Sequence, residues 1–140
     1  MVDMTSRYLF DLMQRYRAKM KTAVGAKALN LNAMHIQCIR YINEVGNCTA
    51  NLIVQGLDRD KSQISLVIRD MAKRGWIELL PNPEDKRSKL IKLTDEGTEL
   101  LEKVIQEEAV VAQKMKEGLS HEDIETFDRI VLTMQKNLMK

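Results

Sequence analysis

The sequence has 140 residues, of which 44% are hydrophobic and 30% are charged; this composition fits one folded domain and excludes a disordered chain. Residues 1–93 carry 16 Lys and Arg against 9 Asp and Glu, a net charge of +7, while residues 94–140 carry 6 against 11, a net charge of −5. Only the first portion is therefore suited to a polyanionic partner.

Two helices are predicted in the first third of the chain. Residues 5–24 repeat apolar side chains at helical spacing, with basic residues between them. A second helix is predicted over about residues 32–45, with Asn32 as its N-cap and Gly46 at its end.

A helix-turn-helix pattern follows. Thr49 is predicted to cap a short helix that Gly56 closes, and Asp60 to cap a longer helix over residues 61–74. The apolar side chains of the longer helix share one stripe, so its small polar side chains face outwards, as in a helix that lies in the major groove of DNA. The candidate DNA-binding residues of this segment are Thr49, Lys61, Ser62, Gln63, Ser65, Leu66, Arg69 and Arg74.

The segment "WIELLPNPEDKRSKLIKL" predicts a β-hairpin with a charged turn. Strands over residues 76–80 and 88–93 flank the turn, and Pro81 and Pro83 belong to the turn or to an edge because proline donates no backbone hydrogen bond. A charged turn alone fits a solvated surface loop. Beside a helix-turn-helix it favours a winged helix whose tip reaches phosphates or the minor groove. The candidate residues of the tip are Lys86, Arg87, Ser88 and Lys89.

Two further helices are predicted in the rest of the chain. Thr94 is predicted to cap a long helix to about residue 116, and Ser120 with Asp123 to open the last helix after Gly118. The last helix carries an apolar stripe at spacings of 3, 4, 3 and 4 residues, which either packs within the chain or pairs two copies. The stripe consists of Ile124, Phe127, Val131, Met134 and Leu138. The predicted fold class is mostly α with a small β-hairpin, a winged helix-turn-helix lobe plus a helical dimerisation part.

The stretch "DKRSKLIKLTDEG" resembles the Asp-x-Arg-Ser wing and the following Leu-Thr-x-x-Gly of the MarR family of bacterial transcriptional regulators. The order of the predicted helices is similar to that family over nearly the whole chain. The resemblance implies a homodimer that binds a palindromic operator as a repressor, with Arg87 in the minor groove and Asp85 steadying the wing. The residues that carry the resemblance are Asp85, Arg87, Ser88, Leu93, Thr94 and Gly97.

The resemblance also implies how one domain, residues 1–140, is organised. Residues 31–93 form the DNA-binding lobe, residues 94–116 a linking helix, and residues 1–30 and 117–140 the dimerisation helices. A dimer doubles the phosphate contacts of one lobe and reads two half-sites about 34–36 Å apart, so dimerisation serves DNA binding. The expected dimerisation residues are Leu9, Phe10, Ile124, Phe127, Val131, Met134 and Leu138.

The resemblance further implies a small-molecule effector, because regulators of this family respond to small aromatic or phenolic anions. The alternative is that the candidate ligand-binding residues belong to an ordinary core. A thiol-based redox regulator that uses Cys48 or Cys38 is another alternative. The two cysteines make no disulfide framework, and without a signal-like N-terminus or a membrane-length apolar run a cytoplasmic protein is expected. The candidate ligand-binding residues are Met13, Tyr16, Met34 and His35.

Other classes of function compete with a DNA-binding regulator. A winged-helix protein–protein module uses the same basic tip, but the small polar residues of the preceding helix favour base edges. The sequence holds no Gly-rich phosphate loop, nucleophile elbow or His-Glu-x-x-His motif, so no enzyme, cofactor or metal is expected. Leu66 and Arg69 stand where the family often has an Arg and an acid, so the operator sequence cannot be carried over.

Overall fold

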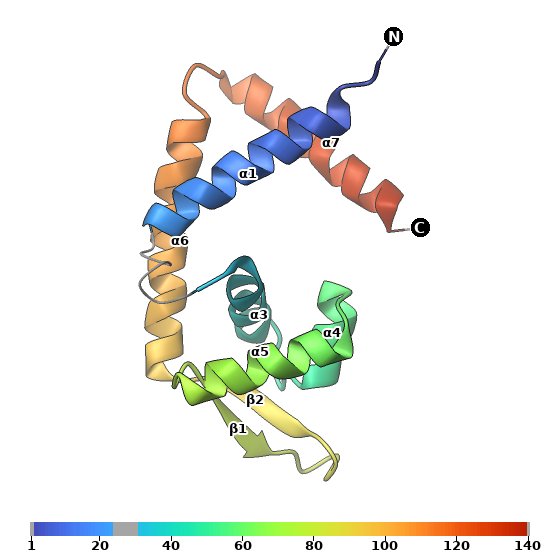
Figure 1. Ribbon diagram of the computed structural model, residues 1–140, viewed down its shortest axis with the longest axis vertical. Helices are drawn as coiled ribbons and strands as arrows, with labels where there is room; N and C mark the ends of the chain where they lie inside the picture. Colours follow the sequence, from blue (N-terminus) through green and yellow to red (C-terminus); the bar gives the residue numbers. More distant parts are fainter. Residues whose placement is uncertain (1, 24–30, 140) are drawn as a thin grey trace. The chain divides into compact units, whose positions relative to one another are not determined.

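The computed structural model describes residues 2–23 and 31–139. The predicted fold class, mostly α-helical with one antiparallel hairpin, is confirmed in these residues (Figure 1). The end predicted for the first helix at residue 24 lies outside them. The chain divides into two compact units, Met1–Glu108 and Ala109–Lys140. The elements are α1 (Thr5–Ala23), α3 (Ala33–Glu44), α4 (Ala50–Leu57), α5 (Lys61–Lys73), β1 (Ile77–Pro81), β2 (Lys89–Leu93), α6 (Asp95–Met115) and α7 (His121–Leu138).

Most helix starts follow local capping chemistry. The side chains of Asn32, Thr49, Thr94 and Ser120 each accept the backbone N–H of the residue three positions later, as predicted. The reciprocal bond that completes a capping box at Ser120 is also present. These bonds satisfy backbone donors that have no partner within the helix, so the sequence fixes where the helices begin.

The end of α4 differs from the prediction that Gly56 closes this helix. Helix α4 continues to Leu57 and stops at Asp58, whose φ of 50° takes the left-handed conformation. Gly56 instead lets α3 and α4 approach, because a Cβ there would lie 2.3 Å from the ring of Tyr41. Its lack of a side chain is therefore a packing requirement and not a helix stop.

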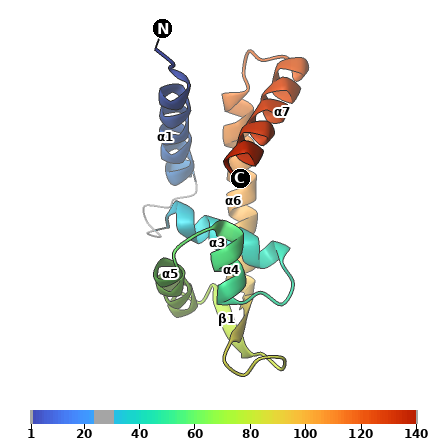
Figure 2. The same ribbon diagram turned by 90° about the vertical axis from the view of Figure 1, so that its right-hand side faces the viewer.

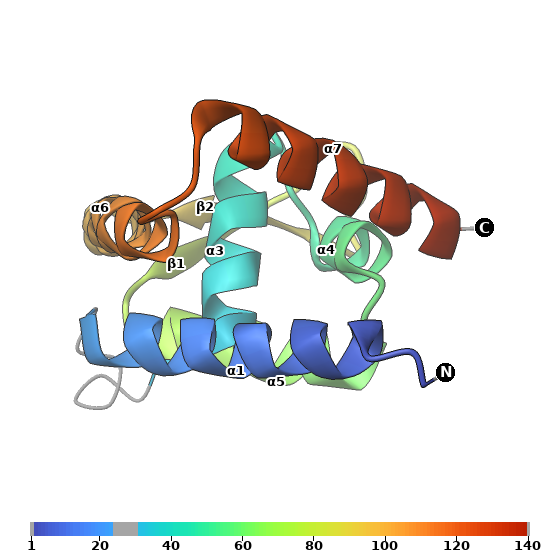
Figure 3. The same cartoon turned by 90° about the horizontal axis from the view of Figure 1, so that it is seen from above.

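The first unit has one core, built around α3. Helix α3 contacts α4, α5 and β2, and in Figure 3 it lies between α6 and α4. Burying each aliphatic side chain there contributes roughly 1.5–3 kcal/mol before the entropy of ordering is counted. The largest fully buried side chains are Ile39, Ile53, Ile64, Met71, Cys38 and Cys48.

The hairpin leaves this core as it runs towards its tip. The two strands pair from Ile77 with Leu93 to Pro81 with Lys89, so β1 starts one residue later than predicted and includes Pro81 at the end of the ladder. Ile77 is buried at the base, whereas Leu79 on the same face of the strand is exposed. Figure 2 shows the hairpin extending below α4 and α5. A protruding two-stranded hairpin beside α5 is the wing of a winged helix, and we call residues 77–93 the wing.

The second unit holds the end of α6, a turn and α7. Gly118 forms the turn with a φ of +81°, a conformation that suits glycine. Within the described part of α7, no side chain is fully buried in the chain. Among the residues that the structure describes, no helix combines the length and the apolar character needed to cross a membrane.

Candidate nucleic-acid interface

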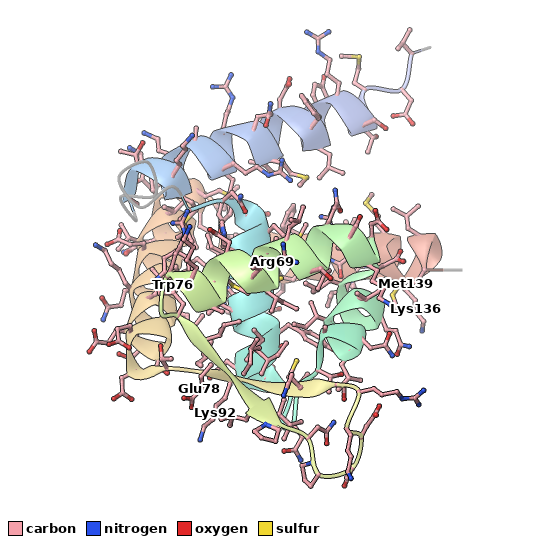
Figure 4. All side chains as sticks on the ribbon, turned by 60° about the horizontal axis from the view of Figure 1, so that its bottom comes forward. Arg69, Trp76, Glu78, Lys92, Lys136 and Met139 are labelled. Carbon is pink, nitrogen blue, oxygen red and sulfur yellow. The ribbon has the colours of Figure 1, made fainter. Side chains whose placement is uncertain are left out.

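Helix α5 presents a polar outer face. Ile64, Ile68 and Met71 are buried against the rest of the first unit, which fixes the helix and turns its opposite side to solvent. Arg69 lies near the middle of α5 in Figure 4 and is exposed. Leu66 is 63% exposed, and an apolar side chain in this place suits the methyl group of thymine. The exposed predicted contacts on α5 are Lys61, Ser62, Gln63, Ser65, Leu66 and Arg69.

Two hydroxyl groups predicted to bind DNA already make bonds within the protein. The Thr49 hydroxyl accepts the Leu52 N–H at 3.3 Å at the start of α4. The Ser62 hydroxyl donates to Asp60 Oδ2 at 2.9 Å. Asp60 occupies the predicted N-cap position of α5, but its carboxylate accepts the Ser62 hydroxyl and not a backbone N–H of the helix. Ser62 keeps an acceptor lone pair for a base or a phosphate partner.

The wing tip, residues 82–88, carries two acidic and two basic side chains and is ordered by hydrogen bonds among its own residues. Asp85 Oδ1 accepts the Arg87 N–H at 2.9 Å, and the Ser88 N–H donates to the Asp85 carbonyl oxygen at 3.2 Å. The Arg87 side chain is 95% exposed, and its Nε lies 3.7 Å from Asp85 Oδ1. An exposed pair at this distance contributes little stability. The guanidinium group is therefore presented to solvent from a fixed backbone, with exposed Lys86 and Lys89 beside it.

Arg74, also predicted to bind DNA, is held by its neighbours. Its Nε donates to Asp70 Oδ2 at 3.0 Å, and its guanidinium carbon lies 5.0 Å from the centre of the Trp76 ring. Figure 4 shows Trp76 at the end of α5, where the chain enters the wing, with Glu78 and Lys92 on the paired strands beyond it. Arg74 thus joins α5 to the base of the wing, and its contact with DNA stays a prediction.

The Leu-Thr-x-x-Gly stretch fastens the wing to α6. The Thr94 hydroxyl donates to the Gly75 carbonyl oxygen and accepts the Gly97 N–H. The Thr94 N–H donates to the Trp76 carbonyl oxygen at 3.1 Å. A Cβ at Gly97 would lie 2.0 Å from that same oxygen, so only glycine allows α6 to approach Trp76. These bonds hold the end of α5, the base of the wing and the start of α6 together.

Known proteins show the same arrangement. A model described as a winged helix DNA-binding domain matches residues 31–97, which span α3 to the Gly97 junction. MarR from Salmonella typhimurium is 27% identical over 104 residues, which cover 74% of this chain and 72% of that protein. A variant of MarR from Escherichia coli, in a structure with operator DNA, has a TM-score of 0.80 at 22% identity and covers 92% of this chain and 91% of its own.

The chain therefore carries a winged helix DNA-binding domain and is similar to MarR transcriptional regulators over most of its length. The resemblance found in the sequence is confirmed, and the protein is a DNA-binding regulator and not an enzyme. The PcaV regulator of Streptomyces coelicolor, in a structure with its natural ligand, is similar over 97% of this chain and 96% of its own, with a TM-score of 0.81 at 18% identity.

His35 links α3 to α5. Its ring is buried, with 5% of the residue exposed. Its Nδ1 accepts the Asn32 N–H at 3.2 Å, so the ring proton is on Nε2, which donates to Asp70 Oδ2 at 2.8 Å. The bond from His35, and then the Arg74 side chain, lower the pKa of the Asp70 carboxyl group. Sequence reasoning missed this link because its partners are 35 residues apart.

A cavity of about 440 Å³ lies between α1, the start of α3 and Glu108 of α6. Met13 and Tyr16, two of the predicted ligand-binding residues, line it. Met34 and His35 are not among its lining residues, and His35 bonds to Asp70 instead. The lining residues are Met13, Tyr16, Arg17, Met20, Lys21, Leu31, Asn32, Ala33, Ile36, Gln37, Arg40 and Glu108.

The wall of the cavity combines apolar surface with positive charge. Arg17, Lys21 and Arg40 supply three cationic groups against the single carboxylate of Glu108, which pairs with Arg40. Burial, and then the charge of Glu108, raise the pKa of Tyr16, so its hydroxyl stays protonated and able to donate. Such a wall suits a small aromatic anion. Sequence reasoning did not identify the cavity-lining residues of α3 and α6, because the α1 side chains that they face lie far away in the sequence.

The two cysteines have surroundings that disfavour the thiolate. Cys38 and Cys48 are both buried, and burial raises the pKa of each thiol to about 11. Because the thiolate is the reactive form, both groups are poor nucleophiles at neutral pH. The thiol-sensing alternative therefore gains no support from their environment.

Large apolar side chains are exposed on both predicted dimerisation helices. On α1, Leu9 and Phe10 are exposed. On α7, Ile124 and Val131 are half-buried, while Phe127, Met134 and Leu138 are exposed. Exposed aromatic and aliphatic groups of this size mark a surface for association. Sequence reasoning did not single out Ile130 and Leu132, which are also exposed on α7.

Proposed function

We propose that this protein is a homodimeric, cytoplasmic repressor that binds a palindromic operator and is released by a small aromatic or lipophilic anion. One observation carries the DNA-binding part of the proposal: the polar face of α5 and the charged wing tip are both exposed, and the backbone bonds of Trp76 with Met71 and Thr94 join α5 to the base of the wing. A rigid pair of this kind reaches two adjacent grooves of one duplex. The operator-bound structure of E. coli MarR supports it by analogy.

In the proposed complex the two elements have different tasks. The side chains of Gln63, Ser65 and Leu66 read base edges in the major groove, since they are exposed in the N-terminal half of α5. Arg87 enters the minor groove or contacts its phosphates, and Lys86 and Lys89 neutralise phosphates nearby. Base selection then resides in α5, and most of the salt-dependent affinity resides in the wing.

The proposal is tested by Arg87→Ala in a duplex titration across salt. Loss of one phosphate contact per bound lobe is expected to weaken binding to all sequences and to flatten the log–log salt slope by about 1 per lobe. Lys103→Ala, which removes an equal charge from exposed α6, serves as the control and leaves the slope unchanged. An unchanged slope for Arg87→Ala removes the wing from the mechanism, and no duplex affinity at low salt favours the protein–protein module instead.

The effector part of the proposal is supported by the cavity. Its three cationic groups attract a carboxylate or phenolate, and its Met13, Tyr16 and Met20 side chains cover an aromatic ring. Asn32 lines this cavity and donates its N–H to His35, which in turn bonds to Asp70 on α5. A ligand that moves the start of α3 therefore acts on the recognition helix through a short chain of hydrogen bonds.

Benzoate and its neutral analogue benzamide test this effector site. Benzoate is expected to raise the thermal midpoint of the protein and to release duplex DNA, while benzamide does neither, because the cavity selects an anion. Arg17→Met is expected to weaken benzoate binding about fivefold to tenfold, whereas Lys19→Met, on the same helix and outside the cavity, leaves it unchanged. Equal binding of the two probes contradicts anion recognition without affecting the DNA-binding proposal.

A further inference from the structure

The wing tip is held together by a residue that has no charge and no place in the predicted DNA contacts. The strand ladder ends where Pro81 pairs with Lys89, so residues 82–88 lie beyond the last pair of the sheet. Within this tip Asn82 and Ser88 are half-buried, while the five residues between them are exposed. Asn82 is thus the first residue after the ladder, opposite Ser88, the last residue before the chain re-enters it.

Asn82 bonds to both sides of the tip. Its Nδ2 donates to Ser88 Oγ at 2.9 Å, which closes the loop across the hairpin. Its Oδ1 accepts the Glu84 N–H at 3.0 Å, and its carbonyl oxygen accepts the Asp85 N–H at 3.3 Å. The Asn82 side chain therefore takes the place of the ladder hydrogen bonds that the tip lacks. The turn over residues 82–85 is also held by bonds to Asn82.

We propose that Asn82 is a positioning residue that sets the backbone of Arg87 for DNA binding. This inference rests on the proposed function of the wing. Asn82 fixes Asp85 through the carbonyl bond, and Asp85 fixes Arg87 by accepting its N–H at 2.9 Å. On the other side, Asn82 fixes Ser88, whose N–H and hydroxyl both donate to the Asp85 carbonyl oxygen. Arg87 lies between two anchors that both depend on Asn82.

Asn82 contributes to DNA affinity by ordering the wing tip in the free protein. The Arg87 side chain is almost fully exposed and has only a 3.7 Å contact with Asp85, so little but its backbone restricts where the guanidinium group points. A disordered tip has to be ordered on binding, and that entropy is subtracted from the affinity. Asn82→Ala is therefore expected to weaken duplex binding about fivefold while Arg87 itself is still present.

A double-mutant cycle tests the proposal with Asn82→Ala, Arg87→Ala and the double variant of the full-length protein. If Asn82 acts through Arg87, Asn82→Ala weakens duplex binding about fivefold in the native background and less than about twofold in the Arg87→Ala background. Equal effects in both backgrounds overturn the proposal. Asn43→Ala, the same change at an exposed site on α3, is the control and leaves affinity unchanged.

Two further measurements separate failure of this inference from failure of the proposed function. If Arg87→Ala leaves duplex affinity unchanged, the wing contact fails. Amide hydrogen exchange at Arg87 and Ser88 in the free protein then decides: faster exchange in Asn82→Ala supports the positioning role, and unchanged exchange overturns it. If Asn82→Ala does not fold, Ser88→Ala removes the other partner of the same bond and takes its place in the cycle, with the same expected coupling to Arg87.

Discussion

Gly97→Ala is expected to lower the free energy of unfolding by about 3 kcal/mol and to abolish a stable reading surface. A Cβ at this position lies 2.0 Å from the Trp76 carbonyl oxygen and 3.0 Å from its carbon. The Trp76 backbone cannot retreat, because its N–H donates to the Met71 carbonyl oxygen at 3.0 Å and its own carbonyl accepts the Thr94 N–H at 3.1 Å. The helix has to move away from the base of the wing, and several bonds are lost together.

Urea unfolding of Gly97→Ala and Gly46→Ala measures this effect. Gly46 is the matched control, because a Cβ there meets no atom within 4 Å and its backbone is outside the left-handed region. Gly46→Ala is expected to change stability by less than about 1 kcal/mol, with a small gain from restricting the unfolded chain. Similar midpoints for the two variants show that α6 can shift without cost and contradict the rigid junction.

Features that depend on a few neighbouring residues were predictable from the sequence. The caps at Asn32, Thr49, Thr94 and Ser120 each involve a side chain and an N–H three residues on, so a local pattern determines them. Helical and strand periodicities, and hence the winged fold, are local in the same sense. The charged wing tip was predictable because charges on a proline-flanked turn have no core to enter.

Features that join distant residues were not predictable. The pair of Arg40 with Glu108 spans 68 residues, and it turns one wall of the cavity from an ordinary helix face into a charged one. His35 was predicted to bind a ligand, but its ring instead forms a hydrogen bond with the Asp70 carboxylate on α5. Gly56 was predicted to end a helix because glycine often does so. Only the position of the Tyr41 ring shows that Gly56 is needed to leave room for that ring.

Phe127→Glu is expected to convert the proposed dimer into monomers and to halve the log–log salt slope of duplex binding. Phe127 is a large aromatic side chain of α7 that is 48% exposed in the single chain, the kind of residue that anchors interfaces. An unpaired carboxylate buried in the interface costs several kcal/mol, so the dimer dissociation constant is expected to rise at least about 100-fold. Analytical ultracentrifugation gives the dissociation constant, and the duplex titration gives the slope.

Gln135→Glu adds the same charge to an exposed polar position of α7. It therefore distinguishes the effect of added charge from the effect of disrupting the proposed interface. If α7 builds the dimer through its apolar side chains, Gln135→Glu stays dimeric and binds the operator as before. If both variants lose DNA affinity equally while remaining dimeric, the acidic end of the chain acts by repelling phosphate and α7 is not the interface. If Phe127→Glu becomes a monomer whose salt slope is undiminished, each lobe binds DNA alone, and the need for two lobes on one operator disappears.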